Sequence, residues 1–307
     1  MTYPSVSIII PTLNAGKPLE RCLTSIQALN YPQKRVEVVV VDNGSSRKIK
    51  KQKAKSKNTI KNLSKAWPFR LKVIRNADNL GFAKAVNQGV STSRGTYLFI
   101  TNDDVILEKD CIKNLIEFIL AHPEIGVAGG KIYTTGTKKV WHPAPRYNFY
   151  TSLFRDAKDA NITQEADWIP GSGLCTSKAI WKKLRGFDEG FFFSFEDLDF
   201  CVRAKQAGYK IIYYPQAILW HKDGTTVNRP EFAYFKYYEG YKSKFRFLLK
   251  HGTLAHVITS FLLQFLIFWP YRIIVLKEKS TRAVFAALVW NIRNLLQTRN
   301  MYEKSFK

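Results

Sequence analysis

Cysteines and acidic residues are scarce in this 307-residue chain. The four cysteines are widely spaced and form no C-x-x-C pair, which argues against a zinc cluster or a disulfide framework and favours a reducing cytosol: Cys22, Cys111, Cys175 and Cys201. Only 24 Asp and Glu residues oppose 48 Lys and Arg residues, so the formal net charge is +24. This excess indicates an anionic partner. Charge alone leaves nucleic acid, acidic lipid headgroups and phosphorylated small molecules open.

No apolar run is long enough to predict a membrane span. Residues 254–269 are mostly apolar. Gln264, Pro270 and Arg272 interrupt this region before the roughly 20 apolar residues that a spanning helix needs. An interfacial helix flanked by basic residues fits better.

Two further segments bear on membrane contact. Residues 281–296 predict a last helix with an apolar face and with Arg282, Arg293 and Arg299 around its ends, as expected on an anionic membrane. The alternative is a helical pair that packs on the rest of the chain or forms a dimer contact. The lysine-rich residues 47–65 predict a solvated face or a contact with acidic lipid.

The hydrophobic content of 46% is typical of a globular protein, and its most informative segment is a strand that ends in acids. Residues 96–100 predict a buried strand, and Asn102, Asp103 and Asp104 follow it. Open α/β sheets bind ligands at such strand ends. Two close carboxylates repel each other, so a Mg²⁺ or Mn²⁺ ion and a nucleotide diphosphate would suit them. The alternative is a turn and cap before a helix at residues 108–121.

The N-terminal region predicts a parallel βαβ unit. Residues 6–10 are an apolar run that lacks a basic leader and is too short for a signal peptide, so they predict a strand. A helix at residues 17–28 and a strand at residues 36–41 follow, and these two strand ends should lie side by side. Asp42 is then placed like the acid that binds a ribose or base, although a turn residue before glycine is the alternative.

Two later clusters of polar and glycine residues also have both a ligand-binding and a purely structural interpretation. Asn79 and Gly81 precede a small-residue helix whose N–H groups suit phosphate, or they form an ordinary cap. Gly171, Ser172 and Gly173 allow close backbone approach to a ligand, or form a tight turn.

The acids that open a predicted helix at Glu196, Asp197 and Asp199 also have two interpretations. They complement the helix dipole, or the apolar residues upstream raise one carboxyl pKa toward that of a general base. Further strands are predicted at residues 71–74, 126–132 and 211–214. A lone histidine such as His221 is more often structural than a ligand.

In this order, the motifs resemble the family 2 inverting glycosyltransferases of GT-A fold, especially the bacterial rhamnosyltransferase-like branch. The resemblance covers about residues 4 to 250 and implies an α/β fold, a mostly parallel Rossmann-like sheet with helices on both faces. It implies a catalytic domain at residues 1–228, followed by a helical, basic and apolar membrane-associating region at residues 229–307.

The resemblance also implies roles for individual residues. Asp197 would be the catalytic base and Glu196 would support the acceptor or the geometry. Asp104 and His221 would bind Mg²⁺ or Mn²⁺. The nucleotide-sugar site would comprise Pro11, Thr12, Asn14, Asp42, Asn79, Gly81, Asp103, Gly171, Ser172 and Gly173, with Asp42 on the uracil or thymine base. Asn102 departs from the fullest D-x-D pattern, because it replaces the first aspartate.

The expected function is therefore transfer of a sugar, rhamnose first, from a dTDP- or UDP-sugar to a lipid-linked glycan in cell-surface polysaccharide synthesis. The expected place is the inner face of the cell membrane, with an anionic lipid surface as partner and a homodimer through the C-terminal helices as an option. The alternatives are a polyprenyl-phosphate hexosyltransferase of this fold, a catalytically inactive scaffold and a basic nucleic-acid-binding protein. No nucleic-acid motif supports the last of these, and the acidic clusters would repel a phosphate backbone.

Overall fold

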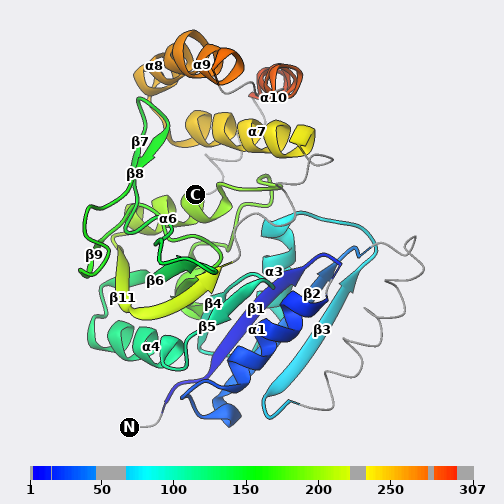
Figure 1. The fold of residues 1–307 in the computed structure, drawn as a ribbon, viewed down its shortest axis with the longest axis vertical. Helices are drawn as coiled ribbons and strands as arrows, with labels where there is room; N and C mark the ends of the chain where they lie inside the picture. The colour runs from blue at the N-terminus through cyan, green and yellow to red at the C-terminus, as the bar shows by residue number, and fades with distance from the viewer. Residues whose placement is uncertain (1–2, 15, 46–66, 222–232, 276–279, 296–307) are drawn as a thin grey trace. The chain divides into compact units, whose positions relative to one another are not determined.

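The structure is a computed structural model that describes residues 3–14, 16–45, 67–221, 233–275 and 280–295 (Figure 1). The lysine-rich residues 47–65 lie outside the described residues. The chain divides into two compact units. The first comprises residues 1–145, 156–190 and 196–223, and the second comprises residues 146–155, 191–195 and 224–307. The domain boundary at residue 228 stays a prediction. The grouping of residues 146–155 and 191–195 with the C-terminal region was not predicted.

A twisted sheet forms the centre of the first unit. Its strand order within the described residues is β3-β2-β1-β4-β10-β6-β11-β5, and β9 also pairs with β11. The strands are β1 (Val6–Thr12), β2 (Val36–Asn43), β3 (Arg70–Asn76), β4 (Tyr97–Ile100), β5 (Val105–Leu107), β6 (Ile125–Thr134), β9 (Gln164–Glu165), β10 (Leu174–Ser177) and β11 (Lys210–His221).

The predicted α/β fold and the parallel βαβ unit are confirmed. Strands β3, β2, β1 and β4 run parallel, and β6 runs parallel to β11. Strand β10 was not predicted, and it lies antiparallel between β4 and β6. The prediction of a short strand at residues 211–214 was wrong in length, because β11 continues to His221 through a register shift between Tyr214 and Ile218.

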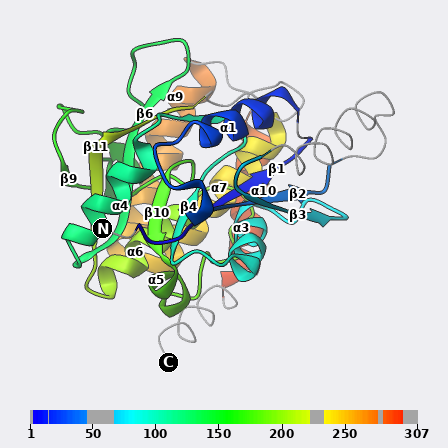
Figure 2. The same cartoon turned by 90° about the horizontal axis from the view of Figure 1, so that it is seen from below.

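Helices cover both faces of this sheet (Figure 2). Alternate β1 residues point to opposite faces, so Ile8 packs in one core and Ile9 in the other, and both are fully buried. The first core contains residues of α1 (Lys17–Gln27) and α4 (Cys111–Ala121). The second contains residues of α3 (Phe82–Thr92), α5 (Lys178–Lys183) and α6 (Glu196–Gln206).

The second unit contains a β-hairpin and a group of helices. The hairpin pairs β7 (Arg146–Asn148) with β8 (Leu153–Arg155). The helices are α7 (Ala233–His251), α8 (Leu254–Leu263), the π-helical turn η3 (Gln264–Phe268), α9 (Trp269–Ile274) and α10 (Thr281–Arg293).

Gln264, Pro270 and Arg272 were predicted to interrupt the apolar segment, but they do not interrupt the helix that it forms. Residues Leu254–Ile274 form one continuous helical run of 21 residues. Pro270 falls in the first turn of α9, where its missing N–H is tolerated, and the π-helical turn precedes it. By length and composition alone, this helix could cross a membrane.

Candidate active site

The acidic triplet lies at the carboxyl end of β4, as predicted. The backbone N–H of Thr101 donates to the Ile9 carbonyl at 3.1 Å, which extends the β1–β4 pairing as far as the triplet. The Thr12 hydroxyl, at the end of β1, donates to the Asp103 carboxylate. Burial raises the pKa of Asp103 to about 6, although the Thr12 hydrogen bond opposes this rise. The carboxylate therefore depends on its neighbours to stay ionised.

Asp104 and His221 come together although 117 residues separate them. His221 ends β11 and pairs with Val105 of β5, so the strand register brings the ring to the triplet. Its Nε2 lies 3.1 Å from Asp104 Oδ1 and 3.4 Å from Asn102 Nδ2. His221 is 8% exposed. A buried imidazole and a partly buried carboxylate that lie close together are a pair of ligands that suits a divalent cation.

This pair does not form a complete metal site on its own. Among the described residues, no three His, Cys, Asp or Glu side chains form a group that could hold a metal ion. Mg²⁺ commonly uses one or two protein ligands and takes its remaining ligands from substrate phosphates and water. The two side chains therefore fit a cation that a nucleotide diphosphate helps to hold.

The predicted nucleoside residues gather at the ends of β1 and β2. The parallel register places Pro11 beside Val41 and Thr12 beside Asp42. The Asp42 carboxylate accepts hydrogen bonds from the Ser45 backbone N–H at 3.2 Å and from the Ser45 hydroxyl. Ser45 Oγ also accepts the backbone N–H of Asn14 at 2.7 Å. These contacts fix the two loops that follow β1 and β2.

Asn43 is a residue that sequence reasoning missed. Its Nδ2 donates to Asn79 Oδ1 at 2.9 Å and to the Gly81 carbonyl at 3.1 Å. Its Oδ1 accepts the Leu80 N–H at 3.1 Å. This amide therefore ties the end of β2 to the Asn79–Gly81 turn, which precedes α3. Several asparagines at neighbouring strand ends were the available signal.

Gly44 allows the Asn79–Gly81 turn to lie close to the end of β2. Its φ of +83° favours glycine, and a Cβ at this position would lie 2.2 Å from the Asp78 carbonyl carbon. Gly81, which precedes α3, also has a φ that favours glycine, at +86°. The Gly81 N–H donates to Asn79 Oδ1 at 3.0 Å.

Asp197 lies at the start of α6 and is held on both carboxylate oxygens. Oδ2 accepts the Gly171 N–H at 2.8 Å, and Oδ1 accepts the Leu198 N–H at 2.8 Å. Burial raises the pKa of Asp197 above its ordinary value, while hydrogen bonds from Gly171, from the Trp168 side chain and from Leu198 oppose the rise. The geometry fixes the orientation of a carboxylate whose basicity is increased, which is what a general base needs.

Glu196 has a different environment. It is 4% exposed, and its Oε2 makes no hydrogen bond to the described residues. Burial, followed by the charge of Asp197, holds the pKa of Glu196 well above its usual range. Glu196 therefore favours the protonated form, and a protonated carboxyl can donate a hydrogen bond.

The Gly171–Gly173 segment links the carboxylate of Asp197 to the acidic triplet. The Thr101 hydroxyl donates to the Ser172 carbonyl at 3.0 Å, directly before the triplet. Gly171 has no room for a side chain, because a Cβ would lie 2.9 Å from the Phe82 ring. The Ser172 hydroxyl is buried without a hydrogen-bond partner in the described part of the chain. The predicted acids thus converge on one end of the sheet.

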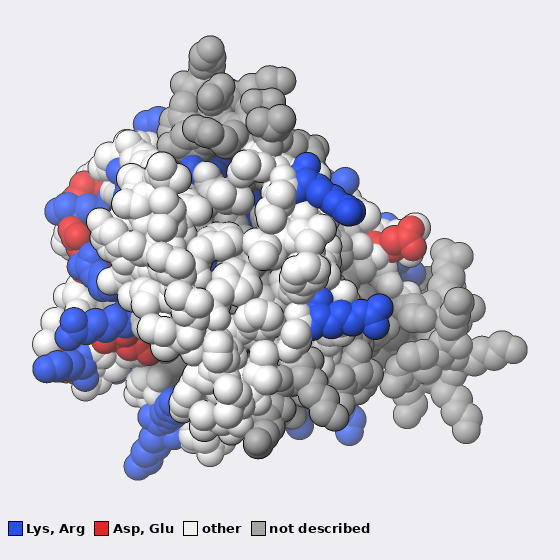
Figure 3. All heavy atoms as spheres, turned by 90° about the horizontal axis from the view of Figure 1, so that it is seen from above, with Lys and Arg blue, Asp and Glu red and all other residues white. Residues whose placement is uncertain are grey.

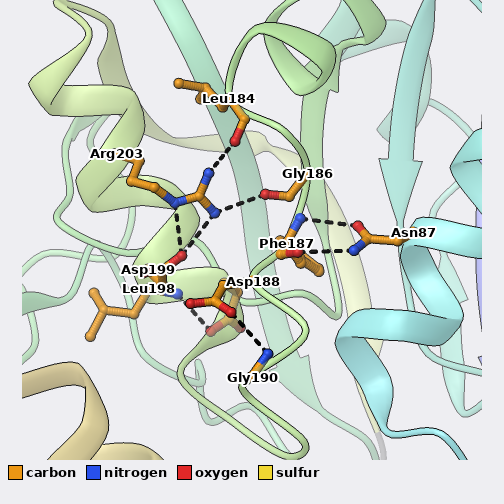
Figure 4. A network of polar contacts seen from close by, with 10 residues as sticks. Asn87, Leu184, Gly186, Phe187, Asp188, Gly190, Leu198, Asp199 and Arg203 are labelled. Carbon is orange, nitrogen blue, oxygen red and sulfur yellow. Dashed lines mark hydrogen bonds and ion pairs between the residues drawn. The ribbon is translucent and has the colours of Figure 1, made fainter. Parts of the chain in front are cut away.

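A second network holds the start of α6 in place (Figure 4). Arg203 Nε donates to Asp199 Oδ2 at 2.8 Å, and the same guanidinium donates to the Gly186 carbonyl at 2.8 Å and to the Leu184 carbonyl. Asn87 of α3 forms two hydrogen bonds with the Phe187 backbone, at 2.9 and 3.0 Å. Asp199 is therefore paired with a guanidinium, whereas Asp197 accepts backbone N–H groups.

Comparison with known families shows the family of this chain. The model for "Glycosyl transferase family 2" matches residues 7–182, more than half of the chain, and this range includes the acidic triplet but not Glu196, Asp197 or His221. The chain belongs to glycosyl transferase family 2. A second model, "Glycosyl transferase family group 2", matches residues 98–292. The protein is therefore an enzyme that transfers glycosyl groups, as the sequence motifs predicted.

Curated relatives of this family 2 glycosyltransferase include rhamnosyltransferases. It is 26% identical over 233 residues to the probable glycosyltransferase YdaM of Bacillus subtilis, covering 73% of this chain and 52% of that protein. It is 24% identical to the O-antigen chain rhamnosyltransferase RfbN of Salmonella typhimurium, covering 75% and 70%. It is 24% identical to the N-acetylglucosaminyl-diphospho-decaprenol L-rhamnosyltransferase of Mycobacterium tuberculosis, covering 73% and 78%. The chain thus spans about half the length of YdaM.

Solved structures support the GT-A fold of this glycosyltransferase. The Pyrobaculum calidifontis mannosyltransferase PcManGT, solved with GDP-Man and Mn²⁺, has a TM-score of 0.60 and 17% identity, covering 95% of this chain and 88% of that one. S. aureus TarS 1–349, solved with UDP-GlcNAc, has a TM-score of 0.60 and 19% identity, covering 96% and 81%. At these identities the likeness concerns the fold.

Proposed function

We propose that this enzyme transfers a sugar, with rhamnose as the first candidate, from a dTDP- or UDP-sugar to a hydroxyl of a lipid-linked glycan, with inversion at the anomeric carbon. The observation that carries the proposal is the convergence of two acidic sites at one end of the sheet. Asp104 and His221 form one site, and Asp197 is oriented by Gly171 in the other. Two relatives support this sugar and acceptor: one is an O-antigen chain rhamnosyltransferase and the other an N-acetylglucosaminyl-diphospho-decaprenol L-rhamnosyltransferase.

The donor would lie along the strand ends of β1, β2 and β4. Asp42 would bind the pyrimidine base through its carboxylate, whose other hydrogen bonds come from Ser45. Asn79 and Gly81 would line the nucleotide side, and Asp103 would contact the ribose or the sugar. The Gly171–Gly173 segment would line the sugar side of the donor.

The chemistry follows from the two acidic sites. A sugar hydroxyl is a poor nucleophile at neutral pH, so Asp197 accepts its proton as the hydroxyl oxygen attacks the anomeric carbon. The bond to the diphosphate breaks on the opposite face, and negative charge develops on the departing oxygen. Asp104 and His221 would hold a Mg²⁺ or Mn²⁺ ion, which supplies Lewis-acid stabilisation of that charge when bound. Glu196, which favours its protonated form, donates a hydrogen bond that orients the acceptor.

Calorimetric titration with nucleotide sugars tests the donor site. We expect one pyrimidine donor among dTDP-rhamnose and several UDP-sugars to bind in the presence of Mn²⁺ and to bind much more weakly in EDTA. GDP-mannose serves as the purine comparison. Asp104→Asn should remove the metal dependence, while Asp159→Asn, at an exposed position, serves as the matched control. Equal binding with and without metal in both variants would contradict the assignment of the cation site.

One observation keeps the polyprenyl-phosphate hexosyltransferase as the second candidate. An enzyme that uses polyprenyl phosphate directly would normally carry a spanning helix, and Leu254–Ile274 is long and apolar enough to be one. Transfer assays with polyprenyl phosphate and with polyprenyl-diphospho-N-acetylglucosamine as alternative acceptors separate the two functions. The product on the second acceptor is expected.

We also propose that the enzyme works at the cytoplasmic face of the cell membrane. A lipid-linked acceptor would be presented there, and the four free, buried cysteines suit a reducing compartment. Fractionation of cells that produce the full chain is expected to recover it with membranes, and high salt or carbonate is expected to release it. Recovery in the soluble fraction at low salt would contradict peripheral attachment.

A further inference from the structure

Large exposed apolar side chains concentrate on the C-terminal helices of the second unit. Along Leu254–Ile274 they recur every three or four positions, on both sides of the π-helical turn: Leu254, Ile258, Leu262, Leu266, Ile267, Tyr271 and Ile274. Leu254 is 76% exposed and Leu266 is 69% exposed. Helix α10 adds Phe285 and Ile292, at 61% and 65%. A continuous apolar surface of this kind is typical of a binding face, since single exposed residues need no explanation.

The opposite side of the same helix packs on protein. Phe261 and Phe265 stack near Phe245 of α7, with ring centroids 4.8 and 6.0 Å away. The Gln264 side chain donates to the Thr151 carbonyl of the hairpin turn at 3.0 Å, and the Ser260 hydroxyl bonds to that of Ser152. Both polar side chains are buried. One side of the helix therefore packs against other parts of its own unit.

This packing argues against a spanning orientation. Helix α7, on which Phe261 and Phe265 pack, carries Glu239, Lys242, Arg246 and Lys250 within 19 residues. Charged side chains are strongly unfavourable in the hydrocarbon core of a bilayer. A helix that crossed the bilayer would either separate from α7 or pull these charges into lipid. A helix that lies in the membrane plane does neither.

The charges of the second unit suit an acidic surface. Among its described residues, Glu239 is the one carboxylate, and Lys242 pairs with it at 2.8 Å. Ten described Lys and Arg residues oppose it; Arg246 and Lys250 are buried, whereas Arg146, Arg155, Arg282 and Arg293 are exposed. Figure 3, in which α8, α9 and α10 face the viewer, shows a central area without charged residues. Arg282 and Arg293 are exposed at the two ends of α10. An apolar helix face with basic residues at its ends is the pattern of interfacial helices that bind anionic lipid.

We propose that α8, η3, α9 and α10 form a monotopic docking face that lies in the plane of an anionic bilayer. The apolar side chains enter the headgroup and acyl boundary, and the basic side chains remain among the lipid phosphates. This inference is independent of the proposed sugar transfer, because it concerns lipid binding by the second unit. Donor binding by the first unit is measured separately, so either can fail without the other.

Vesicle binding by the full chain tests the docking face. We expect sedimentation with vesicles of equal parts phosphatidylcholine and phosphatidylglycerol, and weaker binding to pure phosphatidylcholine or in high salt. Ile258→Glu and Leu266→Glu should each weaken binding by roughly tenfold or more, because each removes a buried apolar group and adds an unfavourable charge. The matched controls Leu120→Glu and Ile162→Glu alter exposed residues of the first unit, at 52% and 55%, and should bind as the unaltered protein does. Equal loss in all four variants would overturn the proposal.

Depth measurement separates the in-plane helix from a spanning one. Spin labels at Ile258→Cys and Ile274→Cys would report similar shallow depths if the helix lies in the plane. They would differ by about 24 Å along the membrane normal if it spans, at 1.5 Å per residue. The native cysteines are buried, which favours selective labelling. A graded depth would overturn the in-plane orientation. A stable dimer that Leu266→Glu dissociates, with vesicle binding unchanged, would assign the face to a second copy of this chain instead.

Discussion

Replacement of Asp197 by asparagine gives the sharpest test of the catalytic assignment. Positioned general bases contribute roughly 10²- to 10⁴-fold to a rate, so Asp197→Asn should lower kcat for sugar transfer by that factor. Donor affinity should stay unchanged, because no donor contact is assigned to this carboxylate. The expected signature is a loss in kcat with a preserved donor Kd.

Asp197→Asn has two effects on the free energy of unfolding, and they are small and opposite in sign. Both carboxylate oxygens accept a backbone N–H, from Gly171 and Leu198, and an amide can accept only one of them. The lost hydrogen bond costs about 1–3 kcal/mol. Asparagine also removes the unfavourable ionisation of a buried acid, which offsets part of this cost. The thermal midpoint should therefore change by only a few degrees.

The pH profile adds a second readout. Because burial raises the pKa of Asp197, the unaltered enzyme should lose activity as the pH falls through a value above that of an ordinary aspartate. Glu196 titrates with it, so the acid limb reports the pair. The residual rate of Asp197→Asn should lack this limb.

The assay is single-turnover transfer of labelled rhamnose from dTDP-rhamnose to polyprenyl-diphospho-N-acetylglucosamine, with Asp159→Asn as the control. If Asp197→Asn keeps more than about a tenth of the rate and an unchanged acid limb, Asp197 is not the base.

Three further changes test the stability of the site. Burial favours the protonated form of Glu196, so the folded protein loses stability as the pH rises from the carboxyl pKa of the unfolded chain through the raised pKa of the folded one. Glu196→Gln removes this ionisation and should raise the Tm at pH 8. Calorimetry should show the gain vanishing below about pH 4. Gly44→Ala should destabilise the fold by more than about 2 kcal/mol in urea unfolding, whereas Gly208→Ala, also at positive φ but with open space around it, should cost only about 1–2 kcal/mol. Arg203→Met leaves its buried aspartate partner without the guanidinium and should cost about 3–5 kcal/mol, and an unchanged midpoint would contradict a structural role.

The parts of the fold that sequence predicted best have local signals. The strands β1, β2 and β4 are short apolar runs that end in polar residues, and a parallel βαβ unit follows from their order. Their ends are therefore adjacent by topology, and Asp42 and Asp103 could be placed without any long-range contact. Pairing of Asp104 with His221 came from the resemblance, since no spacing rule brings residue 221 to residue 104.

The C-terminal helices show where local rules mislead. Gln264, Pro270 and Arg272 were expected to interrupt the apolar run before it reached the length of a spanning helix. The hairpin supplies a carbonyl for the Gln264 amide, and the π-helical turn accommodates Pro270. Both solutions are tertiary or irregular, so composition and periodicity contain no signal for them.

Strand β10, which was also not predicted from the sequence, positions part of the site through its direction. Leu-Cys-Thr-Ser at residues 174–177 is too short and too mixed to predict a strand. As β10 it runs antiparallel to β4, so it begins where β4 ends, with Leu174 beside Ile100. The preceding Gly171–Gly173 segment then lies at the carboxyl end of β4, where Thr101 binds Ser172 and Gly171 orients Asp197. A parallel strand would carry that segment to the opposite edge of the sheet. The antiparallel direction of β10 therefore brings Asp197 and the acidic triplet to one end of the sheet, as the proposed transfer requires.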